Sequence, residues 1–359
     1  MLIALPCSTA GATVLKMAYG YRINEKGLDP LVETTKTTIS NFSLAAVPMG
    51  WAVDIVTALQ YLPDWFPGTG FKKTARRYRS IVEASAYPPY RFVQRQMVAG
   101  EHQPSYVSKL IEQLERENGG LKAEDEEAII WSAASLFGAA SDTTVITLTA
   151  FALAMVLFPE MQRKAQEEID RVVGKDRLPT FSDREELPYI NAMIKETTRW
   201  WPMAPMGFPH TATETFYHEG MQIPKGAYLL PAVWWFLHDP SVYSDPESFE
   251  PERFLSPRNE PDPDSETFGY GRRRCPGRFF ADVSLYLNIA QTLAGFSIDK
   301  AVDGDGKEIE VHVKPGPGVL TYVDKFPFQV KPRSASHADM IRWMEQQFSL
   351  DSEGDAALL

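Results

Sequence analysis

Residues 268–277 read Phe-Gly-Tyr-Gly-Arg-Arg-Arg-Cys-Pro-Gly, and an apolar run typical of a helix follows over residues 278–287. Pro276 and Gly277 are predicted to begin that helix, because proline is favoured at the first helical position, where its missing N–H would be unpaired anyway. The free N–H groups of the helix start would then point towards the sulfur of Cys275. Together with three neighbouring arginines they favour a thiolate, the form of cysteine that binds metal.

A lone free cysteine is usually buried and inert, which is the alternative for this residue. The pattern Phe-x-x-Gly-x-Arg-x-Cys-x-Gly favours a ligand instead, because it fixes five residue types over ten positions. It resembles the haem-thiolate loop of the cytochrome P450 family, and the matching positions are Phe268, Gly271, Arg273, Cys275 and Gly277. The resemblance implies a mostly α fold with small β-sheets. It also implies heme b as the cofactor, bound by these residues, with Cys275 as the axial ligand of the haem iron.

Composition narrows the class of protein. The chain has 359 residues, which is ample for one large domain with a buried core. Its net charge of -11 argues against nucleic acid as a partner, because phosphate binding needs a basic surface. Two cysteines, Cys7 and Cys275, give no disulfide framework and fit a reducing compartment. The N-terminus is not typical of a signal peptide, and the apolar stretch near residues 44–59 is too short and interrupted for a transmembrane segment.

A long helix is predicted from about residue 125 to residue 157, with Ala-Ala-Ser-Asp-Thr-Thr at 139–144. A mid-helix threonine can bond back to the carbonyl four residues earlier and bend the helix. One reading of the small residues here is a helix-packing face. The resemblance implies instead that Asp142 and Thr143 are the acid–alcohol pair that delivers protons to bound dioxygen. The family usually has glycine where this chain has Ala140.

A second helix is predicted over residues 189–200, where Glu196 and Arg199 lie on one face at i and i+3. As a surface pair they would contribute little. The family's corresponding helix carries the same Glu-x-x-Arg, and its partner arginine lies in a later Pro-Glu-Arg-Phe-like segment. The counterpart here is Arg253, which implies a buried structural triad of Glu196, Arg199 and Arg253 that fixes geometry.

The segment 202–230 resembles the small β region that lines the substrate side of the haem. His210 falls where the family places a basic residue against a haem propionate, although a solvent-exposed loop histidine fits equally well. The resemblance places the substrate pocket among three apolar stretches, residues 134–140, 203–209 and 316–320, which favours a small lipophilic substrate.

The remaining chain is predicted to be mainly helical before residue 175, and to alternate β-like runs with turns over residues 295–332. Leu15, Ala18 and Tyr19 share one face of the first helix. The helix over residues 71–80 is basic, so that its charged face is either solvated or at a membrane surface. The tail after Ser334 is expected to fray. The other predicted helices cover residues 1–24, 30–38, 42–59 and 160–174.

The resemblance predicts a partial P450 domain over residues 1–333 and a C-terminal tail over residues 334–359. No counterpart of the family's membrane anchor or N-terminal third is recognisable, so the chain reads as an N-terminally truncated member. The implied function is a monooxygenase that inserts one oxygen atom from O2 into a small lipophilic, terpenoid-like compound of fungal secondary metabolism. The alternative is a catalytically silent haem-binding relic or a non-functional fragment.

The implied redox partner is NADPH-cytochrome P450 reductase, whose acidic docking face would meet the local basic patch. The resemblance also implies that the full-length protein lies at the cytosolic surface of the endoplasmic reticulum membrane. The residues expected to form the basic patch are Arg272, Arg274 and Arg278.

Overall fold

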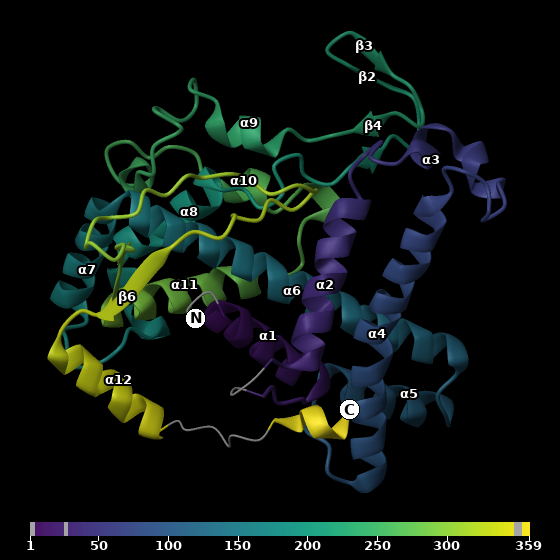
Figure 1. The fold of residues 1–359 in the computed structure, drawn as a ribbon, viewed down its shortest axis with the longest axis horizontal. Coiled ribbons are helices and arrows are strands. Elements are labelled where there is room, and N and C mark those ends of the chain that lie inside the picture. The colour runs from purple at the N-terminus through teal and green to yellow at the C-terminus, as the bar shows by residue number, and fades with distance from the viewer. Residues whose placement is uncertain (1–3, 25–27, 348–353) are drawn as a thin grey trace. The chain divides into compact units, whose positions relative to one another are not determined.

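The computed structural model describes residues 4–24, 28–347 and 354–359, and side chains from residue 11 onwards. The side chain of Cys7, the start of the first predicted helix and part of the predicted tail therefore lie outside the described residues. The chain forms two compact units, residues 1–145 with 347–359, and residues 146–346. Figure 1 labels the elements of both.

The first unit is helical. Its elements are α1 (Ala4–Tyr19), α2 (Pro30–Ala45), α3 (Ala52–Ile55), η1 (Thr57–Tyr61), α4 (Gly70–Ala99), α5 (Tyr106–Asn118), the first part of α6 (Ala123–Leu157), and η5 (Asp355–Leu358). The predicted apolar face of α1 is confirmed, since Leu15, Ala18 and Tyr19 are buried. Helix α2 begins at Pro30 because Asp29 caps it, accepting a hydrogen bond from the Leu31 amide at 2.9 Å.

The second unit combines helices with three small antiparallel sheets, which pair β1 (His210–Thr211) with β4 (Tyr228–Leu229), β2 (Phe216–His218) with β3 (Met221–Ile223), and β5 (Phe296–Lys300) with β6 (Phe328–Pro332). Its helices are the rest of α6, α7 (Pro159–Val172), η2 (Phe181–Glu186), α8 (Pro188–Trp200), α9 (Val233–His238), η3 (Pro251–Phe254), α10 (Asp264–Thr267), η4 (Gly271–Arg273), α11 (Arg278–Gly295) and α12 (Ala335–Gln347). The predicted mostly α fold with small sheets is therefore confirmed.

The core of the second unit forms around α11. Leu285, Ile289 and Leu293 repeat at four-residue spacing along this helix and are buried. They belong to one apolar cluster with buried residues of α7 and α8, such as Ile169 and Met193. Helix α11, whose N-terminus follows the Cys275 loop, is thus anchored by packing along much of its length.

Two predicted segments are wrong. The sequence suggests separate helices over residues 30–38 and 42–59, but α2 runs unbroken over Pro30–Ala45 and ends before Pro48, since proline and the residue before it disfavour a continuing helix. The tail expected to fray after Ser334 instead forms α12. Ile341 of this helix lies against Gly295, where a Cβ would be 3.3 Å from its side chain, so an apolar contact orders it.

Helix α6 is, among the described residues, the one helix long and apolar enough to cross a membrane. Those two criteria alone do not distinguish a span from a core helix, and 67% of its most apolar stretch is buried within the protein. The apolar stretch near residues 44–59 includes the end of α2, the short helix α3 and the start of η1.

Candidate functional site

The Cys275 loop joins α10 to α11 and turns sharply at two glycines. Gly269 has φ 78° and Gly271 has φ 54°, backbone conformations that glycine adopts without the strain a side chain would cause. The amide of Cys275 donates to the carbonyl oxygen of Phe268 at 2.8 Å, which closes the loop at its base. The positive φ explains why the motif needs glycine at position 271, and the backbone bond fixes the position of Cys275 directly after the turn.

Cys275 is a free, half-buried cysteine two residues before the helix. Helix α11 begins at Arg278 with Gly277 as its N-cap, so the predicted start at Pro276 is too early by two residues. A Cβ added at Gly277 would lie 3.7 Å from the Cys275 sulfur, so glycine keeps the space beside the sulfur open. The guanidinium of Arg278 donates to the Cys275 carbonyl oxygen at 3.2 Å and stabilises this end of the loop.

The Cys275 loop carries three arginines of its own. Arg272, Arg273 and Arg274 are all exposed, and Arg274 donates to the backbone oxygen of Asp264 at 3.2 Å. Within the described residues the side chain of Arg273 makes no hydrogen bond or ion pair, which leaves it available to a carboxylate. A soft sulfur ligand beside an available guanidinium is a donor set that fits a haem, which needs an axial ligand and partners for its propionates. The residues present therefore fit the cofactor that the motif implies.

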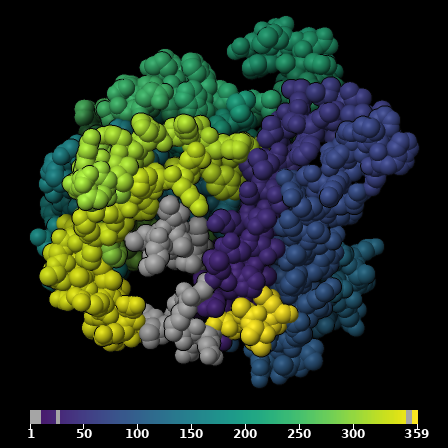
Figure 2. Space-filling model, in the orientation of Figure 1, coloured from purple at the N-terminus to yellow at the C-terminus, as the bar shows by residue number. Residues whose placement is uncertain are grey.

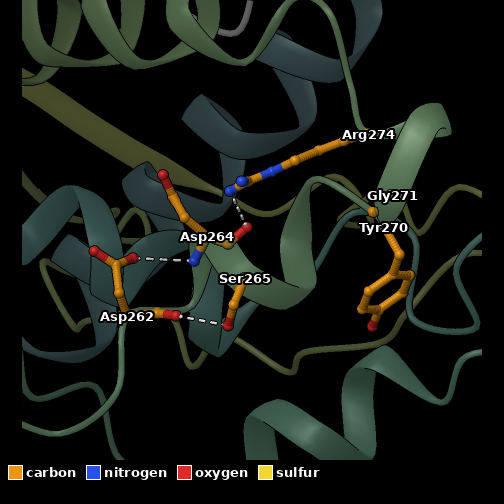
Figure 3. Close-up of a pocket in the computed structure, with 7 residues that line it drawn as sticks. Asp262, Asp264, Ser265, Tyr270, Gly271 and Arg274 are labelled. Carbon is orange, nitrogen blue, oxygen red and sulfur yellow. Dashed lines mark hydrogen bonds between the residues drawn. The ribbon is translucent and has the colours of Figure 1, made fainter.

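A cavity of about 490 Å³ adjoins the loop on the side of α10 (Figure 3). Asp262 accepts from the Asp264 amide at 3.0 Å and its backbone oxygen accepts from Ser265 Oγ at 3.0 Å, so hydrogen bonds shape one wall. Burial, followed by the charges of Asp262 and Asp282, raises the pKa of Asp264. The lining residues are Asp262, Asp264, Ser265, Gly269, Tyr270, Gly271 and Arg274, without Cys275.

Glu196, Arg199 and Arg253 converge in the interior of the second unit. Glu196 accepts from Arg199 Nε at 2.7 Å and from Arg253 Nε at 3.0 Å, and all three side chains are 0% exposed. Glu196 Oε1 also accepts from the Glu250 amide at 2.8 Å. A buried ion triad with this many hydrogen bonds is a structural junction, since removing Glu196 would leave the buried charge of Arg199 without its counter-charge.

Sequence patterns mark neither Glu260, a further member of this junction, nor His238, which is buried near it. Glu260 accepts from Arg253 Nη1 at 2.7 Å, although it lies in an irregular segment that carries no pattern. His238 is buried against the face of Trp234, with ring centroids 4.4 Å apart, and its Nδ1 lies 2.9 Å from the Trp234 carbonyl oxygen. Burial lowers the pKa of His238 to about 4, with smaller contributions from the nearby arginines, so the imidazole is neutral at physiological pH.

Asp142 and Thr143 lie in the part of α6 that belongs to the first unit. Thr143 Oγ1 donates to the Ala139 carbonyl oxygen at 2.8 Å, the back-bonding expected of a mid-helix threonine. Asp142 is buried and borders a cavity of about 20 Å³, enough for about one water molecule. The cavity is lined by Val32, Lys36, Phe137, Ser141, Asp142 and Val145.

The predicted site residues thus fall in both units. Asp142 and Thr143 belong to the first unit, whereas Cys275 belongs to the second. His210 also lies in the second unit, where it is exposed in β1 and pairs with Leu229.

The chain resembles known proteins over most of its length. A family model described as Cytochrome P450 matches residues 6–321. A multifunctional cytochrome P450 monooxygenase of Aspergillus fumigatus is 51% identical over 342 residues, which cover 94% of this chain and 64% of that protein. The cytochrome P450 monooxygenase CLM2 of Gibberella zeae is 47% identical, covering 98% of this chain and 66% of that protein. The monooxygenase claR of Ampulloclitocybe clavipes is 46% identical, with 93% and 62% covered. The chain thus spans just under two thirds of the length of these relatives.

Proposed function

This chain belongs to the cytochrome P450 family, and we propose that it acts as a haem-thiolate monooxygenase that inserts one oxygen atom from O2 into a small lipophilic substrate of fungal secondary metabolism. The observation that carries the proposal is the Cys275 loop, with a free, half-buried cysteine before α11 and an open space at Gly277 beside its sulfur. The fungal relatives, named as monooxygenases, support the reaction class.

Cys275 is the proposed axial ligand of the haem iron. When bound, the haem supplies oxygen activation, and a thiolate ligand favours O–O cleavage. Phe268, Gly271 and Gly277 shape the loop around the sulfur, while Arg273 is available to pair with a propionate. His210 is proposed as a second propionate partner, which its exposed position in β1 allows.

Asp142 and Thr143 are the proposed proton carriers. The carboxylate of Asp142 borders a cavity with room for about one water, which gives it a route for receiving a proton. Thr143 Oγ1 can pass a proton on, because a hydroxyl both donates and accepts. Its bond to the Ala139 carbonyl oxygen sets the direction of the side chain before any transfer.

NADPH-cytochrome P450 reductase is the proposed electron donor. Arg272 and Arg274 are exposed beside the Cys275 loop, and Arg278 follows at the start of α11. This local positive charge stands out in a chain of net charge -11. An acidic docking face on the reductase would complement it and speed the encounter.

Oxygen-isotope labelling tests the proposed reaction. The chain would be reconstituted with haem, mixed with the reductase and NADPH, and supplied with a panel of lipophilic fungal metabolites under 18O2. We expect a product with one 18O atom that forms only when the reductase is present. Failure to take up haem, or a product without 18O, would contradict the proposal.

We further propose that residues 49–66 rest on the cytosolic surface of the endoplasmic reticulum membrane. Neither α3 nor η1 buries a residue, and Tyr61 and Trp65 are 82% and 80% exposed. The segment lies at the surface of the first unit (Figure 2). The large apolar side chains exposed here are Met49, Ile55, Val56, Tyr61, Trp65 and Phe66.

The start of α4 adds positive charge next to these apolar side chains. Asp64 neutralises part of it, pairing with Arg76 at 2.7 Å and with Lys72 at 3.8 Å. Exposed aromatic residues beside cations suit the boundary between acyl chains and anionic headgroups. The cations are Lys72, Lys73, Arg76, Arg77 and Arg79.

Vesicle flotation tests the membrane proposal. We expect the double variant Tyr61→Ser/Trp65→Ser to bind phosphatidylcholine–phosphatidylserine vesicles several-fold less than the unchanged chain, because its two most exposed aromatic side chains there are lost. The matched control is Trp343→Ser, since Trp343 is 59% exposed on α12. Equal losses in both variants would show that this segment has no special role.

A further inference from the structure

A strap of residues 177–187 runs along α11, the helix that follows the Cys275 loop. Gln291 donates to the Pro179 carbonyl oxygen at 3.0 Å, and the Tyr286 hydroxyl donates to that of Thr180 at 2.9 Å. The ring of Phe181 stacks on Tyr286 with centroids 6.2 Å apart. The strap therefore contacts the middle of α11 before its chain reaches α8.

Among the contacts between the strap and α11, that of Arg184 lies nearest to the Cys275 loop. Its Nη1 and Nη2 donate to the two carboxylate oxygens of Asp282 at 2.8 and 2.6 Å. Asp282 lies in the second turn of α11, seven residues after Cys275. The guanidinium also lies 4.9 Å from the ring centroid of Tyr286, one turn further along the helix. A bidentate pair of this kind fixes direction as well as distance.

The same guanidinium connects α11 to α8, the helix that carries Glu196 and Arg199. Arg184 Nε donates to Asn191 Oδ1 at 2.9 Å. The Asn191 amide donates in turn to the carbonyl oxygens of Arg184 and Leu187, at 2.9 and 3.0 Å. One side chain thus holds the second turn of α11 in a set position relative to α8 and the strap.

We propose that Arg184 is a positioning residue for the Cys275 loop: its fork to Asp282 and its bond to Asn191 hold the first half of α11, and through it the sulfur of Cys275, in place for the iron. The placement of the sulfur for iron rests on the function proposed above, whereas the role of Arg184 in holding α11 does not. Without this bidentate pair, the charge of Asp282 loses its partner and the second turn of α11 loses its link to the strap and α8, although the apolar core still holds the helix from Leu285 onwards.

The opposite end of α11 provides a matched control. Arg333 Nη1 and Nη2 donate to Asp170 at 2.8 and 2.7 Å, and Nη1 also donates to the Ala294 carbonyl oxygen at 3.2 Å. This is also a partly buried, bidentate pair that contacts α11, but it lies at the C-terminal end of the helix. Loss of either pair removes a bidentate arginine–aspartate contact, and the two contacts lie at opposite ends of the helix.

Hydrogen exchange of the haem-free chain is the first test. For Arg184→Gln we expect exchange over residues 269–282 to quicken on the order of tenfold, as follows from losing charge-assisted hydrogen bonds. For Arg333→Gln the faster exchange should be confined to residues 288–295. If Arg184→Gln leaves residues 269–282 as slow as before, or if both variants speed the same amides, the positioning role is refuted.

The absorption spectrum of the haem-loaded, reduced, carbon monoxide-bound variants is the second test. We expect Arg184→Gln to lower the fraction with the thiolate-type band, and Arg333→Gln to leave that fraction as in the unchanged chain. Equal fractions in all three proteins would overturn the link between Arg184 and the sulfur. The absence of the band in the unchanged chain would instead refute the haem-thiolate function, while the exchange result would still decide whether Arg184 holds the loop.

Discussion

Replacing Glu196 with glutamine is expected to destabilise the protein by about 3–5 kcal/mol, because it leaves the buried Arg199 without its counter-charge and leaves Arg253 with Glu260 as its nearest acidic partner. Arg199 and Arg253 are both fully buried, and each is paired with Glu196 within 3.0 Å. The amide of Glu250 loses its charged acceptor as well. Glutamine keeps the shape of the side chain, so the loss reports the charge rather than a cavity.

The free energy of unfolding, measured in urea, checks this expectation against Glu160→Gln. Glu160 pairs with Arg163 in the same i, i+3 arrangement, but the two side chains are 68% and 55% exposed. An exposed pair contributes about 0–1 kcal/mol, so the control should be nearly neutral. Similar losses for the two variants would mean that the buried junction does not stabilise the fold in the way its geometry suggests.

Replacing Cys275 with histidine is expected to abolish oxygen insertion while leaving a bound haem. Imidazole also ligates haem iron, but it does not push electron density as a thiolate does. The thiolate-type band of the reduced carbon monoxide complex should disappear, and product should fall to the level seen without reductase. Cys7→Ser, which removes the other cysteine of the chain, should retain both the band and the product. A Cys275→His protein that keeps the thiolate band would show that another residue binds the iron.

The local patterns in the sequence were sufficient to predict the main helices. The long helix expected over residues 125–157 is α6 (Ala123–Leu157), and the helix expected over residues 189–200 is α8 (Pro188–Trp200). Helix α8 has strong apolar periodicity, which reports the secondary structure directly. Helix α6 is instead apolar on most of its circumference, and its length marks it as a buried helix. The helix expected over residues 42–59 failed because apolar residues there suggested burial, while Pro48 and the following turn set the actual boundary.

Contacts between distant parts of the sequence could not be predicted in the same way. The pairing of Arg184 with Asp282 spans 98 residues, and no motif marks either member. Glu260 likewise completes the environment of Arg253 from an irregular segment. The tail was expected to fray because its end is acidic and rich in small residues, yet Asp355 accepts a hydrogen bond from the Arg22 amide at 2.8 Å within the first unit. Such contacts depend on the folded backbone, which composition does not reveal.

The central claim is that Cys275 binds haem iron as a thiolate, and one spectrum tests it most directly. The chain is reconstituted with haem, reduced and exposed to carbon monoxide, and its absorption is recorded. The account predicts the red-shifted band of a thiolate–carbonyl complex, at an intensity that matches the haem content. A spectrum with only the band of a neutral thiol or imidazole ligand, or a chain that binds no haem, would contradict it.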